Sequence, residues 1–172
     1  EASDSQVEYG TTTGYGSSTS VASAMVTSHS ATLSGLQAGT LYHYRVKSKD
    51  AANNLATSGD FTFTTSADTT APTISGVGAS GISLSGATIN WTTNEASDSQ
   101  VEYGTTTGYG SSTPLASALV TTHSVILSSG LQGSTLYHYR VKSRDASGNL
   151  ATSGDFTFTT SADTTAPNIS AV

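Results

Sequence analysis

The sequence predicts an all-β protein built from tandem two-sheet sandwiches. First, one long segment occurs almost twice in the 172 residues. Second, each copy contains short runs in which β-branched and aromatic residues alternate with polar ones, as in half-buried strands. Third, Gly, Asn, Asp and Ser separate these runs, and no run of helical length shows a period of 3.6 residues. Several short strands in each copy are typical of a sandwich.

The internal repeat defines the organisation of the chain. Glu1–Thr19 is identical to Glu95–Thr113, and Asn54–Pro72 is identical to Asn149–Pro167. The offset is 94 residues in the first pair and 95 in the second. A repeat of this length matches one small domain rather than one unit of a solenoid, whose repeats are roughly 20–50 residues long. Each copy is therefore expected to fold by itself.

The repeat predicts four parts in the chain. Residues 71–160 form one complete repeat, and 1–65 form a copy that lacks its first two strands because it has no counterpart of Pro72–Asn94. Residues 66–70 form a linker, which Pro72 helps to stiffen. Residues 161–172 form the next linker and the first strand of a further repeat. We expect the chain to be a window from a longer array.

The strands of the complete repeat follow from its alternation. The predicted strands are Thr73–Val77, Ala87–Thr92, Gln100–Tyr103, Leu115–Val120, His123–Leu127, Leu136–Ser143 and Gly154–Thr159. The residues predicted to face inward are Ile89, Trp91, Val101, Tyr103, Tyr137, Tyr139, Val141, Phe156 and Phe158. His138, Arg140 and Lys142 fall between the inward positions of their strand and are expected to face outward.

Composition excludes several classes of function. Only 10% of the residues are charged, and the net charge is −6 with six Lys and Arg in total. Binding to nucleic acid needs clustered basic residues, so it is not expected. The acidic balance disfavours an anionic membrane, and no apolar run approaches the roughly 20 residues that span a bilayer. With abundant Ser and Thr and no Cys, the chain fits an extracellular or cell-surface protein of a prokaryote.

A family resemblance rests on three features of the copies. These are Trp91 in the second strand, the run from Leu131 to Tyr137, and the matching run from Leu36 to Tyr42. Together they resemble the fibronectin type III family, an immunoglobulin-like sandwich in which such a Leu and Tyr form the tyrosine corner. The resemblance implies that the hydroxyls of Tyr42 and Tyr137 bond to nearby backbone.

A second resemblance concerns longer runs. VEYGTT followed by LYHYRV is similar to the fibronectin-like N-terminal module of purple acid phosphatases. No metal-binding catalytic domain accompanies the module here, so phosphatase activity is not implied.

The four histidines are duplicated, His29 with His123 and His43 with His138. We interpret the first pair as residues that begin a strand and the second as outward strand residues. No catalytic or cofactor-binding residue is predicted, and the chain is interpreted as non-enzymatic.

Two kinds of site remain as hypotheses. In a fibronectin-type sandwich, Asp68, Glu95, Asp98 and Asp145 would approach one junction between repeats, where several carboxylates could bind calcium. The resemblance to surface repeats with similar linkers implies the same role, and the alternative is that these acids are solvated turn residues. Asn90 and Asn168 each begin an Asn-x-Ser/Thr sequence that permits N-glycosylation.

The main functional hypothesis is a structural repeat of an extracellular stalk, filament or adhesin, whose partners are neighbouring repeats. One alternative is a subunit that polymerises because another chain donates the missing strands. Another is an accessory module of a secreted carbohydrate-active enzyme. In that case Tyr15 and Tyr109 are the aromatic residues that could contact carbohydrate, unless they simply pack over the edge of the sheet.

Overall fold

A computed structural model describes residues 1–128 and 130–166, and the described chain consists of strands and connecting loops. It divides into two compact units, Glu1–Asp68 and Thr69–Val172, with the division inside the predicted linker 66–70. Among the described residues, there is no helix that is long and apolar enough to cross a bilayer. The predicted strand of a further repeat falls within 161–172, and its residues 167–172 lie outside the described residues.

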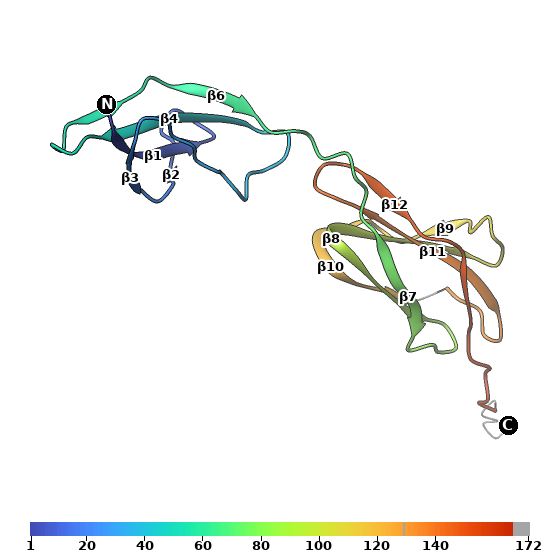
Figure 1. The fold of residues 1–172 in the computed structure, drawn as a ribbon. Coiled ribbons are helices and arrows are strands. Elements are labelled where there is room, and N and C mark those ends of the chain that lie inside the picture. The colour runs from blue at the N-terminus through green and yellow to red at the C-terminus, as the bar shows by residue number, and fades with distance from the viewer. Residues whose placement is uncertain (129, 167–172) are drawn as a thin grey trace. The chain divides into compact units, whose positions relative to one another are not determined.

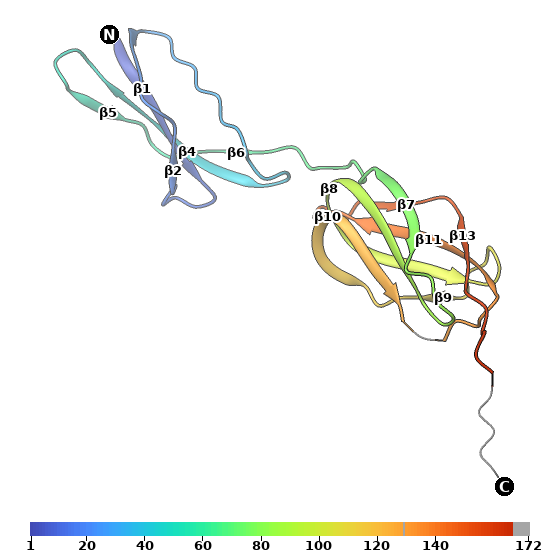
Figure 2. The ribbon, with the colours of Figure 1, turned by 90° about the horizontal axis from the view of Figure 1, so that it is seen from below.

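The second unit is a two-sheet sandwich of seven strands (Figures 1 and 2). They are β7 (Ile74–Ser80), β8 (Ala87–Gly104), β9 (Ser111–Ser112), β10 (Ala116–Leu127), β11 (Leu136–Arg144), β12 (Leu150–Thr152) and β13 (Phe156–Thr159). One sheet contains β7, the first half of β8, and β10. The other contains the second half of β8 with β9, β11, β12 and β13.

One long strand, β8, joins the two sheets. Its first half pairs with β7 and β10, and its residues 100–104 pair with β11. The register on β10 shifts between Val120 and Thr122, and such irregularities bend a strand. The prediction of separate strands at Ala87–Thr92 and Gln100–Tyr103 was wrong because the residues between them keep extended backbone pairing. The separation of Leu115–Val120 from His123–Leu127 was wrong for the same reason, since both lie in β10.

The strands β9 and β12 are two and three residues long and were not predicted. Segments this short contain too few residues to show an alternating pattern. Both are stabilised by their neighbours instead, β9 by β8 and β12 by β11.

The core of the second unit lies between the two sheets. Its buried apolar residues are Ala87, Ile89, Trp91, Val101, Leu127, Leu131, Tyr137, Tyr139, Val141 and Phe158. Most of the residues predicted to face inward are in this set, and Tyr103 packs against it while partly buried. Phe156 was predicted to face inward, but it is 37% exposed. It lines an open depression with β7 residues such as Ile74, so the neighbouring sheet covers its ring incompletely.

The first unit contains six strands around β1 and β4 (Figure 1). They are β1 (Ser3–Gly10), β2 (Ser17–Ser18), β3 (Ala22–Val26), β4 (Leu41–Lys49), β5 (Leu55–Thr57) and β6 (Phe61–Thr64). β1 pairs with β2, β3 and β4, and β4 also pairs with β5 and β6. These pairings match those of the second half of β8 and of β9 to β13, so the shared sequence forms the same sheet in both units.

The first unit has no counterpart of β7 and of the first half of β8 among its own residues. In the second unit, β10 residues 122–127 pair with β8 residues 87–92. The corresponding residues 28–33 of the first unit form no strand. Val46 on β4 is 41% exposed, whereas its counterpart Val141 on β11 is completely buried. The side of β4 that carries Val46 is therefore less covered in this unit than the matching side of β11.

Candidate functional site

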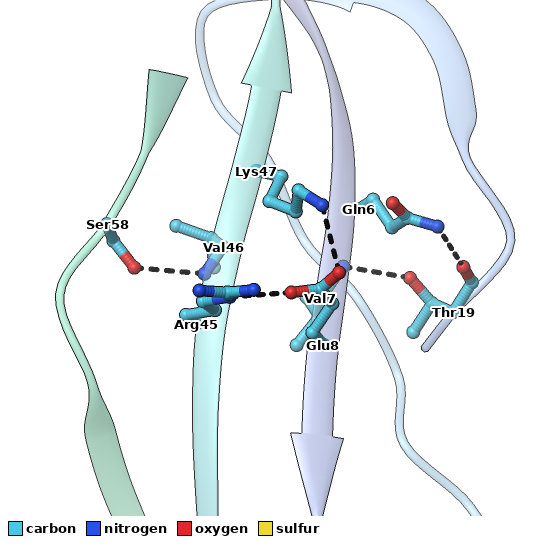
Figure 3. A network of polar contacts seen from close by, with 8 residues as sticks. All are labelled: Gln6, Val7, Glu8, Thr19, Arg45, Val46, Lys47 and Ser58. Carbon is cyan, nitrogen blue, oxygen red and sulfur yellow. Dashed lines mark hydrogen bonds and ion pairs between the residues drawn. The ribbon is translucent and has the colours of Figure 1, made fainter. Parts of the chain in front are cut away.

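A network of polar side chains covers the outer face of the shared sheet. Glu8 on β1 lies opposite Arg45 on β4. Its Oε2 accepts a hydrogen bond from Arg45 Nε at 2.6 Å, and its Oε1 accepts one from Lys47 Nζ at 2.9 Å (Figure 3). These donors, Lys47 first and then Arg45, hold the pKa of Glu8 below its ordinary value. Both charges of the basic pair are thus directed at one carboxylate.

The second unit repeats this arrangement. Glu102 accepts from Arg140 Nε at 2.6 Å and from Lys142 Nζ at 3.1 Å. The bond from Arg140, followed by the bond from Lys142, lowers the pKa of Glu102 although its partial burial opposes the shift. The agreement between the units shows that the network follows from the repeated sequence. Each network joins one carboxylate to two basic side chains, so every charged group in it has a partner, while the network as a whole carries one excess positive charge.

Tyr15 and Tyr109 lie beside this network. The guanidinium carbon of Arg45 stands 4.7 Å from the centroid of the Tyr15 ring, and that of Arg140 stands 4.7 Å from the Tyr109 ring. Burial, and then a hydrogen bond with Asp155, raises the pKa of Tyr109. One face of each ring is therefore covered by a cation, in line with the packing alternative rather than with a free stacking platform for a sugar.

The outward histidines also have acidic partners. His43 Nδ1 lies 2.8 Å from Asp60 Oδ2, and His138 Nδ1 lies 2.8 Å from Asp155 Oδ2. The contact with His43 is the main reason that the pKa of Asp60 is lowered. The position of both histidines on the outer face agrees with the interpretation of His43 and His138 as outward strand residues.

The tyrosine corner residues make the same contact in both units. The Tyr42 hydroxyl accepts a hydrogen bond from the backbone N–H of Gln37 at 3.0 Å, and the Tyr137 hydroxyl accepts one from Gln132 at 2.9 Å. The residue before each donor is a leucine. Leu36 in the first unit is half-buried, and Leu131 in the second unit is buried. The bond satisfies a phenol whose ring is packed in the core.

Trp91 and His123 form a buried polar cluster that the sequence analysis missed. Trp91 Nε1 donates to Ser143 Oγ at 2.9 Å, across the sandwich. His123 lies on the adjacent strand β10 and is 1% exposed, with Nδ1 2.7 Å from Ser99 Oγ and Nε2 2.9 Å from Thr93 Oγ1. Burial lowers the pKa of His123, although Asp98 acts in the opposite direction. Burial thus favours the neutral form of the imidazole.

A signal for this cluster was present in the alternation of β10. His123 has the same parity as Val125 and Leu127, so it lies on their side of the strand, which faces the core. The Ser99–His123 pair has the atoms of a nucleophile and a base, but both residues are buried away from any substrate. In the first unit the corresponding His29 is exposed and lies 3.3 Å from Ser3 Oγ. The cluster therefore has a packing role.

The acidic residues of the calcium hypothesis lie in both units. Within the second unit, Glu95 and Asp145 have carboxylate oxygens within 4.8 Å of each other. Asp98 Oδ1 accepts the backbone N–H of Arg144 at 2.8 Å. Asp68 is the last residue of the first unit. The calcium site stays a prediction.

Asp145 also has a structural role in its own loop. Its two carboxylate oxygens accept the backbone N–H of Asn149 at 2.8 Å and the side-chain amide of Asn149 at 2.9 Å. Burial raises the pKa of Asp145, but these bonds and those from the backbone of Ser147 and Gly148 outweigh it and hold the pKa low. Asp50 accepts the same two bonds from Asn54 in the first unit. The loop is thus built alike in both copies.

One of the two predicted glycosylation positions, Asn90, lies among the described residues. Asn90 lies in β8 between β7 and β10, and its Nδ2 donates to Ser80 Oγ at 2.8 Å. Asn168 lies outside the described residues. Glycosylation at either position stays a prediction.

The fold and the repeated surface define a class of protein. Two sheets joined by one long strand, a buried Trp and a tyrosine corner together make a fibronectin type III-like module. Residues 1–65 and 77–160 match the family described as the purple acid phosphatase N-terminal domain. The chain belongs to this family.

Three relatives carry longer chains. Chitinase A1 of Niallia circulans is 40% identical over 85% of this chain and 21% of its own length. Endoglucanase B of Cellulomonas fimi is 38% identical over 87% and 15%, and exoglucanase B of the same species is 36% identical over 91% and 15%. This chain therefore spans about a fifth or less of each relative. The solved FN1–FN3 domains of chicken CNTN1 are 17% identical, with a TM-score of 0.44 over 93% of this chain and 57% of that one.

Proposed function

We propose that the chain is a non-catalytic accessory module that acts as a spacer in a secreted, bacterial carbohydrate-active enzyme. The observation that carries the proposal is the match to a chitinase and two glucanases, which covers 85–91% of this chain and only 15–21% of theirs. A segment that recurs as a small part of several polysaccharide-degrading enzymes is expected to serve the whole enzyme rather than to perform the reaction.

The chemistry of the described residues supports a passive role. Glu8 and Glu102 are each bonded to two basic side chains. The Ser99–His123 pair is buried. A β-sandwich whose polar groups satisfy one another sets a distance between its neighbours without reacting with a substrate. Because each unit has its own sheet pairings, length can increase by duplication.

A second candidate is a spacer in a cell-surface stalk or filament. It is favoured by the identity of long segments between the two copies, since arrays that only set distance tolerate repeated sequence. Both candidates assign the same physical task to the module. They differ in what the module is attached to.

A deletion in the full-length polypeptide tests the proposal. The two units are replaced by a flexible Gly/Ser linker, and hydrolysis is measured on a soluble oligosaccharide and on insoluble chitin or cellulose. We expect unchanged turnover on the soluble substrate and slower hydrolysis of the insoluble one. Only the solid substrate requires the spacer to hold a fixed distance between the parts of the enzyme on either side of it. Equal loss on both substrates would show a part in catalysis. A full-length polypeptide with no hydrolase activity would favour the stalk instead.

A further inference from the structure

Both units expose the same small group of apolar side chains along one strand. The group consists of Leu115, Leu119 and Val120 in the second unit and of Val21, Met25 and Val26 in the first. We call each group the apolar edge of its unit. The exposed fractions are 55%, 46% and 39% in the second unit and 53%, 42% and 41% in the first. The second unit is a complete two-sheet sandwich, so this exposure belongs to the repeated sequence itself.

The apolar edge lies on a strand with one free side. Among residues 1–128 and 130–166, β10 pairs only with β8, and β3 pairs only with β1. Proteins commonly protect such strands with charged side chains. No Asp, Glu, Lys or Arg occurs from Tyr9 to Tyr44 or from Tyr103 to Tyr139, the segments that contain β3 and β10. This form of protection is therefore missing from both strands.

An irregularity in the strand directs the apolar edge away from the core. On β10, Ala116 and Val120 are separated by more residues than their partners on β8, and the register shifts between them. The register of β3 on β1 shifts in the same manner. Extra residues on one strand form a bulge, which changes the direction of its side chains. Leu119 and Met25 lie at these bulges, where the sheet does not cover them.

The two copies differ at the apolar edge but keep it apolar. Val21 of the first copy corresponds to Leu115 of the second, and Met25 corresponds to Leu119. The exposed position of Ile126 behaves differently, since the first copy has a polar residue there. Exposed positions of this strand can thus change in polarity, whereas those of the apolar edge have not. Apolar side chains that the fold does not bury are available for a contact outside the chain.

The composition of the apolar edge restricts the partner. Nucleic acid and anionic lipid require basic groups, and the segments around β3 and β10 have none. A sugar ring stacks on aromatic side chains, and the apolar edge contains only Val, Leu and Met. The matching surface is therefore another group of aliphatic side chains without charge. A second copy of the chain carries such a surface in each of its units.

We propose that the apolar edge binds the apolar edge of a second copy of this chain. The contact is isologous, because the same surface is used by both partners. The aliphatic side chains of one copy cover those of the other, and the uncharged segments around them bring no like charges together. Each contact is small, so association is weak and depends on concentration. The spacer role proposed above does not require this contact, so either proposal can fail alone.

The rim of the apolar edge agrees with self-association. In the first unit, Val21 lines a depression together with Leu55, which is also exposed. The same depression is lined by Asp4 and Lys49, whose charges are of opposite sign. A two-fold arrangement can direct Asp4 of one copy toward Lys49 of the other, so that unlike charges meet around an apolar centre.

Sedimentation equilibrium of the full 172-residue chain tests the proposal at concentrations from about 10 µM to about 1 mM. We expect the weight-average mass to rise above the 17.4 kDa of one chain as the concentration increases. Amide hydrogen exchange at 22–26 and 116–120 should become slower over the same range, because these segments are covered in the complex.

Lysine substitutions locate the contact. Met25→Lys and Leu119→Lys each place a charge in the apolar edge of one unit. The double variant should weaken association roughly 30-fold or more, because a charge buried against an aliphatic surface is not compensated. Each single variant keeps one intact apolar edge and should associate with intermediate strength. Both side chains are exposed, so the variants should fold, and circular dichroism checks that they do.

Two controls carry the same added charge elsewhere. The double variant with Leu41→Lys and Leu136→Lys replaces leucines that are 49% and 50% exposed, but these lie on β4 and β11, which pair with strands on both sides. Val46→Lys adds a charge at another exposed apolar position of β4. Association should be unchanged in both controls.

Three results would overturn the proposal. The first is a chain that stays monomeric at about 1 mM. The second is association of the Met25→Lys and Leu119→Lys double variant as strong as that of the unchanged chain. The third is an equal loss of association in this variant and in the controls, which would indicate a general attraction between apolar surfaces instead of a defined contact.

Discussion

The indole of Trp91 lies flat on the imidazole of His123, with 4.7 Å between the ring centroids and 3° between the ring planes. The two residues are directly opposite on β8 and β10. The indole N–H crosses the sandwich to Ser143 on β11 of the other sheet. This pair thus connects the two strands of one sheet to each other and both to the second sheet.

Replacing Trp91 with Ala is expected to destabilise the second unit by about 3–5 kcal/mol, because it leaves a large cavity in a closely packed core. The free energy of unfolding can be measured by urea titration, followed by tyrosine circular dichroism since the variant has no Trp. Ser143→Ala serves as the comparison. It removes only the acceptor of the indole N–H and should cost about 1–3 kcal/mol. A loss smaller for Trp91→Ala than for Ser143→Ala would contradict the packing described.

Acid is expected to destabilise the second unit through His123. Burial lowers the pKa of His123 in the folded state. In the unfolded chain a histidine has a pKa of about 6.5. Below that pH the unfolded state takes up a proton that the folded state resists, so the free energy of unfolding falls as the pH falls. The slope can reach about 1.4 kcal/mol per pH unit for one proton.

The unfolding free energy of the chain and of His123→Gln, measured from pH 8 to pH 5, tests this expectation. The Gln side chain can keep a hydrogen bond but has no titration in this range. We expect the variant to be less stable at pH 8 and to show a flatter dependence between pH 6.5 and 5. Parallel curves for the two proteins would mean that His123 does not carry the pH dependence.

Much of the fold could be predicted from the sequence because the same alternating strand patterns occur in both copies of the repeat. Alternation in the LYHYRVKS strand placed Tyr137, Tyr139 and Val141 in the core, where the structure has them. The continuity of β8 could not be predicted in this way. Between Thr93 and Ser99 the sequence has a single apolar residue, Ala96. Thr93, Ser97 and Ser99 line a buried hydrogen-bonded cluster rather than an apolar layer. An alternating apolar pattern therefore stops although the strand continues.

The outer-face network was beyond prediction for a different reason. The sequence places Glu8 and Arg45 on different strands 37 positions apart, and only the register of β1 and β4 brings them together. Likewise, the stacking of Arg140 on Tyr109 depends on the turn before β9, where Tyr109 has a φ of 59°. Register and positive φ are set by tertiary contacts and turn geometry, neither of which composition reports.

Tyr15 and Tyr109 are expected to contribute little to carbohydrate binding. A stacked sugar needs an open aromatic face. Arg45 and Arg140 already occupy one face of each ring, and both rings are half-buried, so little of the second face is left for a sugar. The double variant with Tyr15→Ala and Tyr109→Ala should therefore be retained on insoluble chitin and cellulose as weakly as the unchanged chain. Depletion from the supernatant measures retention. A clear loss in the double variant would assign a carbohydrate site to this face.

Gly104 is expected to tolerate no side chain, because a Cβ at this position would lie 1.4 Å from the backbone oxygen of Tyr109. The close approach arises where the chain returns after β8, and Tyr109 then takes up its positive φ. Gly104→Ala must move one backbone segment away from the other, which should cost roughly 1–3 kcal/mol in unfolding free energy. It should also weaken the contact between Tyr109 and Arg140.

Gly108→Ala in the same turn is the matched control. A Cβ there would meet nothing closer than the Thr106 hydroxyl at 3.5 Å, an ordinary contact. This variant should stay within about 0.5 kcal/mol of the unchanged chain. Thermal unfolding measures both variants, and the Tyr109 ring shifts in NMR report its position under Arg140. Equal stability of the two variants would show that the turn relaxes freely, because the backbone contact at Gly104 would then impose no constraint on it.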